Sequence, residues 1–495
     1  MYDRKGKSLD MGNQKSLKLN FIMNAILTMS SFLFPLITFP YVSRVLLPMG
    51  TGRVSFANSV VTYFVMISQL GIPTYGIRAC AVVRDDEEKL KKTVYELFFI
   101  NVVMSIFAYI VFFAALAYVP RLRADRTLFL ITGTLIFFNT IGVEWLYKAL
   151  EQYTYITIRS IIFKFIALIA MFALVRDTDD DVIYGGISIF AASASNVFNF
   201  IRLRKIIGKR KVTNLNFRRH FMPVFTFFII SCATTIYTNL DNVMLGFIKD
   251  DVEVGYYNAA TKIKNILVSI VTSLGTVLMP RTSYYIQQGM VDEFYRLSKK
   301  AIKFVLLAAS AMMIYFMIFA REGVLFLSGE AFEGAILPMI IVMPTLLFIG
   351  LTNIMGIQML IPMGKENAVM ISTFVGAIVD LILNVICIPR LGSTGAAIGT
   401  LVAEFVVLIV QMIYLKKDVR YLYSKQGYLK ILAALLIAVV SAGIVKVFVP
   451  GVFIKLVISA VLFFGLYGIA LYVMKEEIVT ENLNKGLQMI KSHKQ

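Results

Sequence analysis

The chain is poor in acidic residues, histidine and cysteine. Its 495 residues include 30 Asp and Glu against 49 Lys and Arg, two His and three Cys. Cys80, Cys232 and Cys387 lie in apolar stretches, with no CxxC pair and no neighbouring histidine. The sequence therefore indicates neither a disulfide framework nor a zinc site.

Motifs that carry catalysis are also missing. No GxxxxGK[ST] phosphate loop occurs, so the sequence gives no sign that the chain hydrolyses ATP. His220 lies in a basic loop and His493 near the C-terminal end, and neither has a nucleophile or a metal ligand nearby in the sequence. We therefore expect no enzymatic activity, no metal centre and no organic cofactor.

Apolar sequence dominates the chain. Hydrophobic residues make up 58%, charged residues only 16%, and the mean hydropathy is +0.76, which is far above soluble domains. A membrane-spanning helix needs about 20 mainly apolar residues. We predict an all-α polytopic membrane protein with fourteen such runs: 19–46, 53–77, 93–118, 127–149, 155–175, 182–201, 220–247, 255–279, 300–320, 335–362, 367–388, 394–415, 428–449 and 452–474.

The distribution of Lys and Arg predicts the topology. With fourteen spans, 35 of the 49 lie in segments on the side of the N-terminus and eleven on the opposite side. Cytoplasmic loops of membrane proteins carry the excess of positive charge, so both termini are expected to be cytoplasmic. The net charge of +19 is then a signal of topology and of contact with anionic lipids. We expect no nucleic-acid partner, because the charge is spread over many short loops.

A basic stretch, "IRLRKIIGKRKVTNLNFRRH", marks the middle of the chain. A shift of 203 residues places Gly52 on Gly255 and Arg78 on Arg281, as expected for two six-helix bundles in parallel repeat. The predicted domains are an N-terminal bundle over residues 1–201, a basic linker over 202–219, a second bundle over 220–415, and two appended helices with a tail over 416–495.

Several cations fall inside the predicted spans, where each charge costs about 2.5–3.5 kcal/mol. Lys164 lies near the middle of the fifth span; Lys262 and Lys264 lie in the eighth, about 200° apart around the helix. Snorkelling to the interface explains at most one of that pair, and Arg44 and Arg159 are equally compatible with interfacial anchors. We predict that Lys164, Arg44, Arg159 and at least one of Lys262 and Lys264 line a cavity that receives an anion.

Acidic and amide residues also occur in the spans. Asp380 and Asn384 lie one turn apart on one helix face, Glu404 is equally deep, and Asp241 lies toward the outer end of the seventh span. Two interpretations stay open for these residues. They either carry a coupling sodium ion or proton, or they are structural partners of the lysines.

Four sequence blocks resemble one family. The first is "FPYVSRVLLPMGTGRVSFANSVV" with the following "LGIPTYGIRAC"; the others are "EWLYKALEQYTYITIRSIIFK", "NLDNVMLGFIKDDVEVGYYNAATKI" and "LGSTGAAIGTLVAE". Together they resemble the bacterial polysaccharide and O-antigen flippases of the Wzx type, in the MOP superfamily. Ala149 and Ala79 depart from the usual pattern, which has Gly and an acid there. Matching positions in the first block are Pro40, Tyr41, Ser43, Arg44, Val45, Leu46, Gly52, Gly71, Tyr75, Gly76 and Arg78.

The resemblance implies a transporter that alternates between inward-open and outward-open states. Its expected cargo is an undecaprenyl-pyrophosphate-linked oligosaccharide, moved from the cytoplasmic to the outer leaflet of the bacterial cytoplasmic membrane. A polysaccharide polymerase and chain-length machinery are the implied partners besides membrane lipids. The pyrophosphate is an anion of the kind that the predicted cationic cavity would hold.

Two other functions compete with this interpretation. A cation-coupled multidrug exporter of the same superfamily usually has twelve spans and an acidic cavity. A membrane polysaccharide polymerase usually has a large external loop, which the sequence does not show. Fourteen spans and interior lysines favour the flippase.

Overall fold

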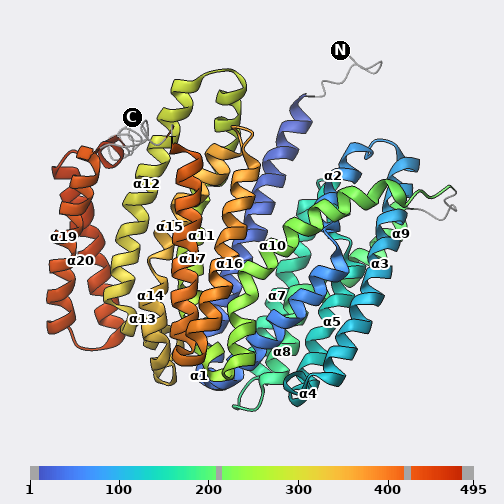
Figure 1. Ribbon diagram of the computed structural model, residues 1–495, viewed down its shortest axis with the longest axis horizontal. Helices are drawn as coiled ribbons and strands as arrows, with labels where there is room; N and C mark the ends of the chain where they lie inside the picture. The colour runs from blue at the N-terminus through green and yellow to red at the C-terminus, as the bar shows by residue number, and fades with distance from the viewer. Residues whose placement is uncertain (1–9, 208–213, 417, 419–424, 482–495) are drawn as a thin grey trace. The chain divides into compact units, whose positions relative to one another are not determined.

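A computed structural model describes residues 10–207, 214–416, 418 and 425–481 (Figure 1). Every regular element in these ranges is a helix, which confirms the predicted all-α architecture. Residues 208–213 of the predicted linker, His493 and most of the predicted cytoplasmic tail lie outside the described residues.

The chain divides into two compact units, Met1–Phe247 and Ile248–Gln495. The helices of unit 1 are α1 (Asp10–Gln69), α2 (Ile72–Val82), α3 (Glu87–Tyr118), α4 (Pro120–Ala124), α5 (Arg126–Gly142), α6 (Glu144–Ala149), α7 (Tyr153–Leu174), α8 (Asp181–Ile189), η1 (Phe190–Ala194), α9 (Asn196–Ile207) and α10 (Arg218–Ile248). Those of unit 2 are α11 (Asp251–Gln287), α12 (Val291–Ile318), α13 (Ala320–Ser328), η2 (Glu330–Ala335), α14 (Ile336–Val342), α15 (Thr345–Thr352), η3 (Asn353–Leu360), α16 (Glu366–Leu391), α17 (Ser393–Tyr414), α19 (Lys425–Phe448) and α20 (Val452–Val473).

The chain is a multi-pass membrane protein. Within the described ranges, nine helices are long and apolar enough to cross a bilayer, or eleven if two bent pairs each form one span. One of the nine, Ile22–Val82, contains two predicted spans, and α5 and the run from α8 to α9 are shorter or interrupted. The structure is therefore compatible with the fourteen predicted spans. Many large apolar side chains are exposed, as lipid-facing residues are.

Left-handed backbone conformations divide helices that the apolar pattern predicts as continuous. Leu47, at φ 58°, separates the two halves of α1, and Val143, at φ 37°, separates α5 from α6. The predicted run 53–77 ends at Gln69 because Gly71 adopts φ 74° before α2 begins. A side chain at Gly71 would also meet the backbone of Phe227 and Phe228 in α10 at 2.5–2.6 Å. Only glycine fits both demands.

In unit 2, α19 and α20 pack on α12 through an aromatic and aliphatic cluster. Tyr315 of α12 and Phe319, which directly follows α12, are buried against Phe463 and Tyr467 of α20. The Tyr315 hydroxyl donates to the carbonyl oxygen of Leu456 at 2.9 Å, which satisfies a polar group that lipid could not. The last two helices are thereby fixed to the rest of unit 2.

An ionic network ties one end of unit 1 together. Arg53 of α1 forms ion pairs with Asp125, between α4 and α5, and with Asp181 of α8 at 2.6 Å. Arg121 of α4 binds the other Asp125 oxygen at 2.9 Å and donates to the Gly246 carbonyl oxygen of α10 at 3.0 Å. The Asp125 and Asp181 side chains are only 7% and 3% exposed, so they depend on these cations.

Replacing Arg53 by Gln is expected to destabilise unit 1 by about 3–5 kcal/mol, because two buried carboxylates lose their shared cation. The measurement is the free energy of unfolding of the detergent-solubilised protein in denaturant. Arg84→Gln is the matched control, because its ion pair with Glu151 is exposed on both sides, and we expect little change. Equal stability of the two variants would show that the network is not structural.

Candidate functional site

Lys164 lies on α7 and contacts two hydroxyl groups of α1. Its Nζ donates to Ser30 Oγ at 2.9 Å and to Ser31 Oγ at 3.0 Å. The side chain is half-buried. Neither hydroxyl carries a charge, so these hydrogen bonds orient the ammonium group without neutralising it.

Arg159 lies five residues earlier on α7 and is buried, with 7% of its surface exposed. One guanidinium nitrogen donates to the Ser195 carbonyl oxygen at 3.1 Å, and another lies 3.8 Å from the Glu144 carboxylate. Its Nε–H is buried and has no hydrogen-bond partner among the described residues. A buried cation with an unused donor is a natural point of contact for an anion.

The carboxylate of Glu144 lies among cations beside this helix. Glu144 begins α6 because the left-handed conformation of Val143 interrupts the helix there. It binds Lys148 at 2.8 Å and lies 3.8 Å from the Arg159 guanidinium. Together with Lys164, which follows Arg159 on α7, these residues form what we call the α7 cationic cluster: Glu144, Lys148, Arg159 and Lys164. It has three cations and one acid, so its net charge is +2 and favours an anionic ligand.

The structure does not place the other predicted cations in this cluster. Arg44, exposed on α1, donates to the Pro40 carbonyl oxygen of its own helix at 2.5 Å. Lys262 and Lys264 belong to unit 2, on α11, where Lys264 is buried and Lys262 half-buried. Both lysines have further interactions within the protein.

The predicted coupling residues fall into two sets. Asp380 and Asn384 are buried on α16 and face Gly399 of α17, where a Cβ atom would lie 2.9 and 2.5 Å from their Oδ1 atoms. Gly399 therefore lets α17 approach both polar groups. Glu404 is buried on α17 of the same unit, whereas Asp241 is buried on α10 of unit 1.

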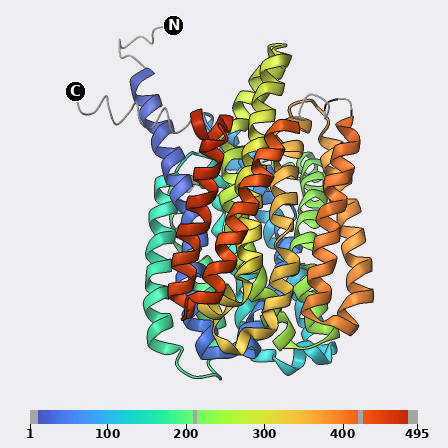
Figure 2. The ribbon, with the colours of Figure 1, turned by 90° about the vertical axis from the view of Figure 1, so that its left-hand side faces the viewer.

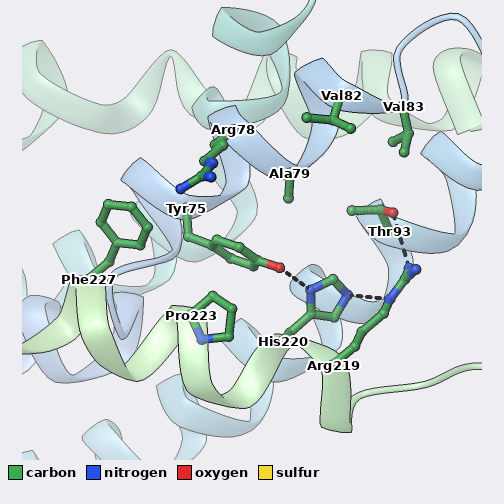
Figure 3. A pocket seen from close by; sticks show the side chains of 10 residues that line it. All are labelled: Tyr75, Arg78, Ala79, Val82, Val83, Thr93, Arg219, His220, Pro223 and Phe227. Atoms are coloured by element: carbon green, nitrogen blue, oxygen red, sulfur yellow. Dashed lines mark hydrogen bonds between the residues drawn. The ribbon is translucent and has the colours of Figure 1, made fainter.

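A second polar site lies where the start of α10 packs on α2 and α3 (Figure 3). It is a cavity of about 350 Å³ at one end of unit 1. Its polar lining comes from two arginines, a histidine, a tyrosine and a threonine, and the rest is apolar. The lining residues are Tyr75, Arg78, Ala79, Val82, Val83, Thr93, Arg219, His220, Pro223 and Phe227.

Glu96 of α3 organises this site. Its fully buried carboxylate accepts from Arg219 at 2.5 Å, from the Asn216 backbone N–H at 2.6 Å, and lies 2.8 Å from His220 Nε2. A carboxylate only accepts, so Nε2–H donates to it, and in the neutral ring Nδ1 accepts from the Tyr75 hydroxyl at 2.8 Å. Arg219 also reaches Thr93 Oγ1 at 3.2 Å.

Sequence reasoning missed this network. It placed His220 in a basic loop without partners, although in the structure its ring contacts Tyr75, Glu96 and Arg219. The available signal was Glu96 itself, a lone acid in "TVYELFFINVV", because a charge in an apolar run needs a partner elsewhere. The partner lies more than 120 residues away along the chain.

A family model described as "Polysaccharide biosynthesis protein" matches residues 17–286, more than half of the chain. The chain belongs to this family. A second model, "MatE", matches residues 227–386. The chain is 25% identical over 411 residues to the Escherichia coli protein named "Putative O-antigen transporter", which covers 82% of this chain and 98% of that one. It is 23% identical over 414 residues to the Shigella dysenteriae protein of the same name, at 80% and 99% coverage.

Solved structures share the fold. A lipid II flippase MurJ in an inward closed conformation superposes with a TM-score of 0.74 at 15% identity, over 92% of this chain and 100% of that one. An inward-facing multidrug resistance MATE transporter of the MOP superfamily gives 0.61 at 14% identity, over 81% and 98%. With the family match, these findings confirm the resemblance to Wzx-type flippases of the MOP superfamily, and the protein is a transporter of this polysaccharide biosynthesis family.

Glu96→Gln is expected to lower the free energy of unfolding by about 1–3 kcal/mol, because Arg219 and His220 lose a charged acceptor. Tyr75→Phe removes only the hydroxyl and is expected to cost about 1 kcal/mol. The measurement is the thermal unfolding midpoint in one detergent. Tyr95→Phe, at the exposed neighbour of Glu96, is the control and should leave the midpoint unchanged. A Glu96→Gln midpoint equal to that of the control contradicts the organising role of Glu96.

Proposed function

We propose that this protein moves lipid-linked oligosaccharide repeat units across the bacterial cytoplasmic membrane for the assembly of a surface polysaccharide. The observation that carries the proposal is the α7 cationic cluster, in which Lys148 and Arg159 share Glu144 while Lys164, on the same helix as Arg159, contacts only hydroxyls among the described residues. Family membership and the relatives named as O-antigen transporters support the cargo class.

The chemistry of the cluster suits a pyrophosphate. An arginine guanidinium binds phosphate oxygens through several N–H groups, and the buried Nε–H of Arg159 supplies one that is not already used. Lys164, held by Ser30 and Ser31, adds a positive charge on the same helix. The polyprenyl tail of an undecaprenyl-pyrophosphate-linked cargo would need no polar site, because it is as apolar as lipid.

A cation-coupled drug exporter is the competing function. Its substrates are cations, which a cluster with a net charge of +2 would repel. The MATE-type fold alone does not separate the two functions, because folds host many activities. The charge of the cluster favours the flippase. A membrane polysaccharide polymerase is disfavoured because the relatives that match over most of this chain are named O-antigen transporters.

Energy for transport would come from an ion. We propose that Asp380, Asn384 and Glu404 in unit 2, or Asp241 in unit 1, bind the coupling sodium ion or proton. Support comes from the burial of the carboxylates and from Gly399, which lets α17 pack closely against the Asp380 and Asn384 side chains. Buried ionisable groups in membrane proteins often mark ion pathways.

The excess of Lys and Arg on one side supports cytoplasmic N- and C-termini, with cargo entering from that side. Partner enzymes would then be a polysaccharide polymerase and its chain-length machinery, which use the cargo after it reaches the outer leaflet.

Deleting the gene in its host is expected to make lipid-linked repeat units accumulate on the cytoplasmic leaflet and to abolish surface polymer. Mass spectrometry of extracted lipids measures the accumulation and identifies the sugar, and the wild-type gene should restore both phenotypes. If no intermediate accumulates and sensitivity to cationic drugs changes instead, the exporter function is correct.

Lys164→Ala, and a double change of Lys262 and Lys264 to Ala, are each expected to leave the protein folded and inserted but to slow transport about 10- to 100-fold. The reason is the loss of about 1.5–3 kcal/mol per charged hydrogen bond to the cargo. Transport is measured as rescue of the deletion strain at equal protein level. Lys446→Ala is the control, because that lysine donates to the carbonyl oxygen of Ile318 at a helix end and is not part of the predicted cationic cavity. Full rescue by both lysine variants would show that these cations do not hold the cargo.

A further inference from the structure

Unit 2 contains a polar cavity that the transport proposal does not use. Its volume is about 650 Å³, and it lies between the end of α11, the start of α12 and the segment that follows α20. Figure 2 shows the hairpin of α11 and α12 extending past the other helices of unit 2 at this end. The lining residues are Arg281, Tyr285, Glu293, Arg296, Leu297, Lys299, Lys300, Lys303, Glu477 and Glu481.

Ion pairs account for every acid that lines this cavity. Arg296 binds Glu293 at 2.5 Å, and Lys300 binds Glu481 at 2.6 Å. Lys303, with a side chain only 12% exposed, binds Glu477 at 3.1 Å and the buried Glu476 behind it at 2.8 Å. These pairs hold the segment after α20 against α12.

Two cations are left over. Arg281 of α11 and Lys299 of α12 line the cavity without an ion-pair partner in the part of the chain that the structure describes. Counting Glu476, the cavity has five cations and four carboxylates, a net charge of +1. One phosphodiester anion would neutralise it, and guanidinium and ammonium groups are the usual partners of phosphate.

The cavity lies at the level where three apolar helix segments end. On α11 the apolar run stops at Pro280, directly before Arg281. On α12 the apolar run begins at Phe304, directly after Lys303, and on α20 it ends at Val473. The junction between apolar and charged sequence marks the membrane interface, where lipid headgroups lie.

We propose that this cavity binds the phosphodiester headgroup of an anionic glycerophospholipid, with Arg281 and Lys299 as the phosphate ligands. Cationic pockets between helices at this level are suited to anionic headgroups. The volume leaves room for the glycerol hydroxyls beside Tyr285 and the carboxylates. Bound lipid would link α11 to α12 across the hairpin, in addition to the ion pairs of the α20 segment.

The experiment titrates phosphatidylglycerol into the detergent-purified full-length protein and measures bound lipid by native mass spectrometry. A double Arg281→Gln and Lys299→Gln variant is expected to weaken binding at least about tenfold, because both phosphate ligands are lost. The matched control is a double Lys365→Gln and Lys475→Gln variant. It removes the same charge from this unit outside the cavity and should bind like the wild type.

Two further measurements test whether the bound phosphate group belongs to a lipid and whether the double variant is folded. Inorganic phosphate and glycerol phosphate are added as competitors at the concentration at which phosphatidylglycerol saturates its site. They are expected to leave phosphatidylglycerol bound. Displacement by either would overturn the assignment to lipid in favour of a free phosphate ion. The melting temperature of the double variant without lipid should match that of the control. Unchanged lipid binding by a folded Arg281→Gln and Lys299→Gln variant would overturn the site itself.

Discussion

This structure depends on one constraint: charged groups buried in the membrane have no water to solvate them. Inside a membrane each ionised group needs a partner within the protein, and a shared partner joins several helices at once. Arg53 meets this demand for both Asp125 and Asp181, and Arg121 adds the end of α10 through Gly246. Glu96 joins segments elsewhere in unit 1, because its carboxylate accepts hydrogen bonds from Arg219, His220 and the backbone N–H of Asn216. The networks around Arg53 and Glu96 thus position helices that apolar packing against lipid would leave free to slide.

At two sites the protein carries more cations than carboxylates. The α7 cationic cluster has three cations for Glu144, and the interfacial cavity of unit 2 keeps Arg281 and Lys299 without ion pairs in the described ranges. In each site the cations outnumber the carboxylates. By contrast, the networks around Arg53 and Glu96 pair their acids closely. Fully paired charge is therefore structural in this protein, and surplus cationic charge marks the places suited to an anionic ligand.

The sequence predicted the helical architecture well because spans depend on local composition. The runs that became α10, α16 and α17 agree within a few residues with the observed helices. Breaks were harder to predict: Leu47 and Val143 adopt positive φ values without being glycine, so tertiary contacts rather than local preference place them. Lys164 and Arg159 were singled out as charges in a span, but Glu144, the acid beside Arg159, was noted only as part of a motif. His220 was missed because its partners, Glu96 and Tyr75, are far away in the sequence.

The composition of the α7 cationic cluster also fits a site that must release what it binds. Three uncompensated cations would hold a pyrophosphate tightly, and a transporter needs binding strong enough for entry but weak enough for exit. Glu144 lowers the net charge to +2 and competes with the cargo for Lys148 and Arg159. Ser30 and Ser31 orient Lys164 through neutral hydroxyls, which the anion can replace at low cost. Moving α1 against α7 would separate these hydroxyls from Lys164, so a rearrangement of these two helices would change the affinity for an anion directly.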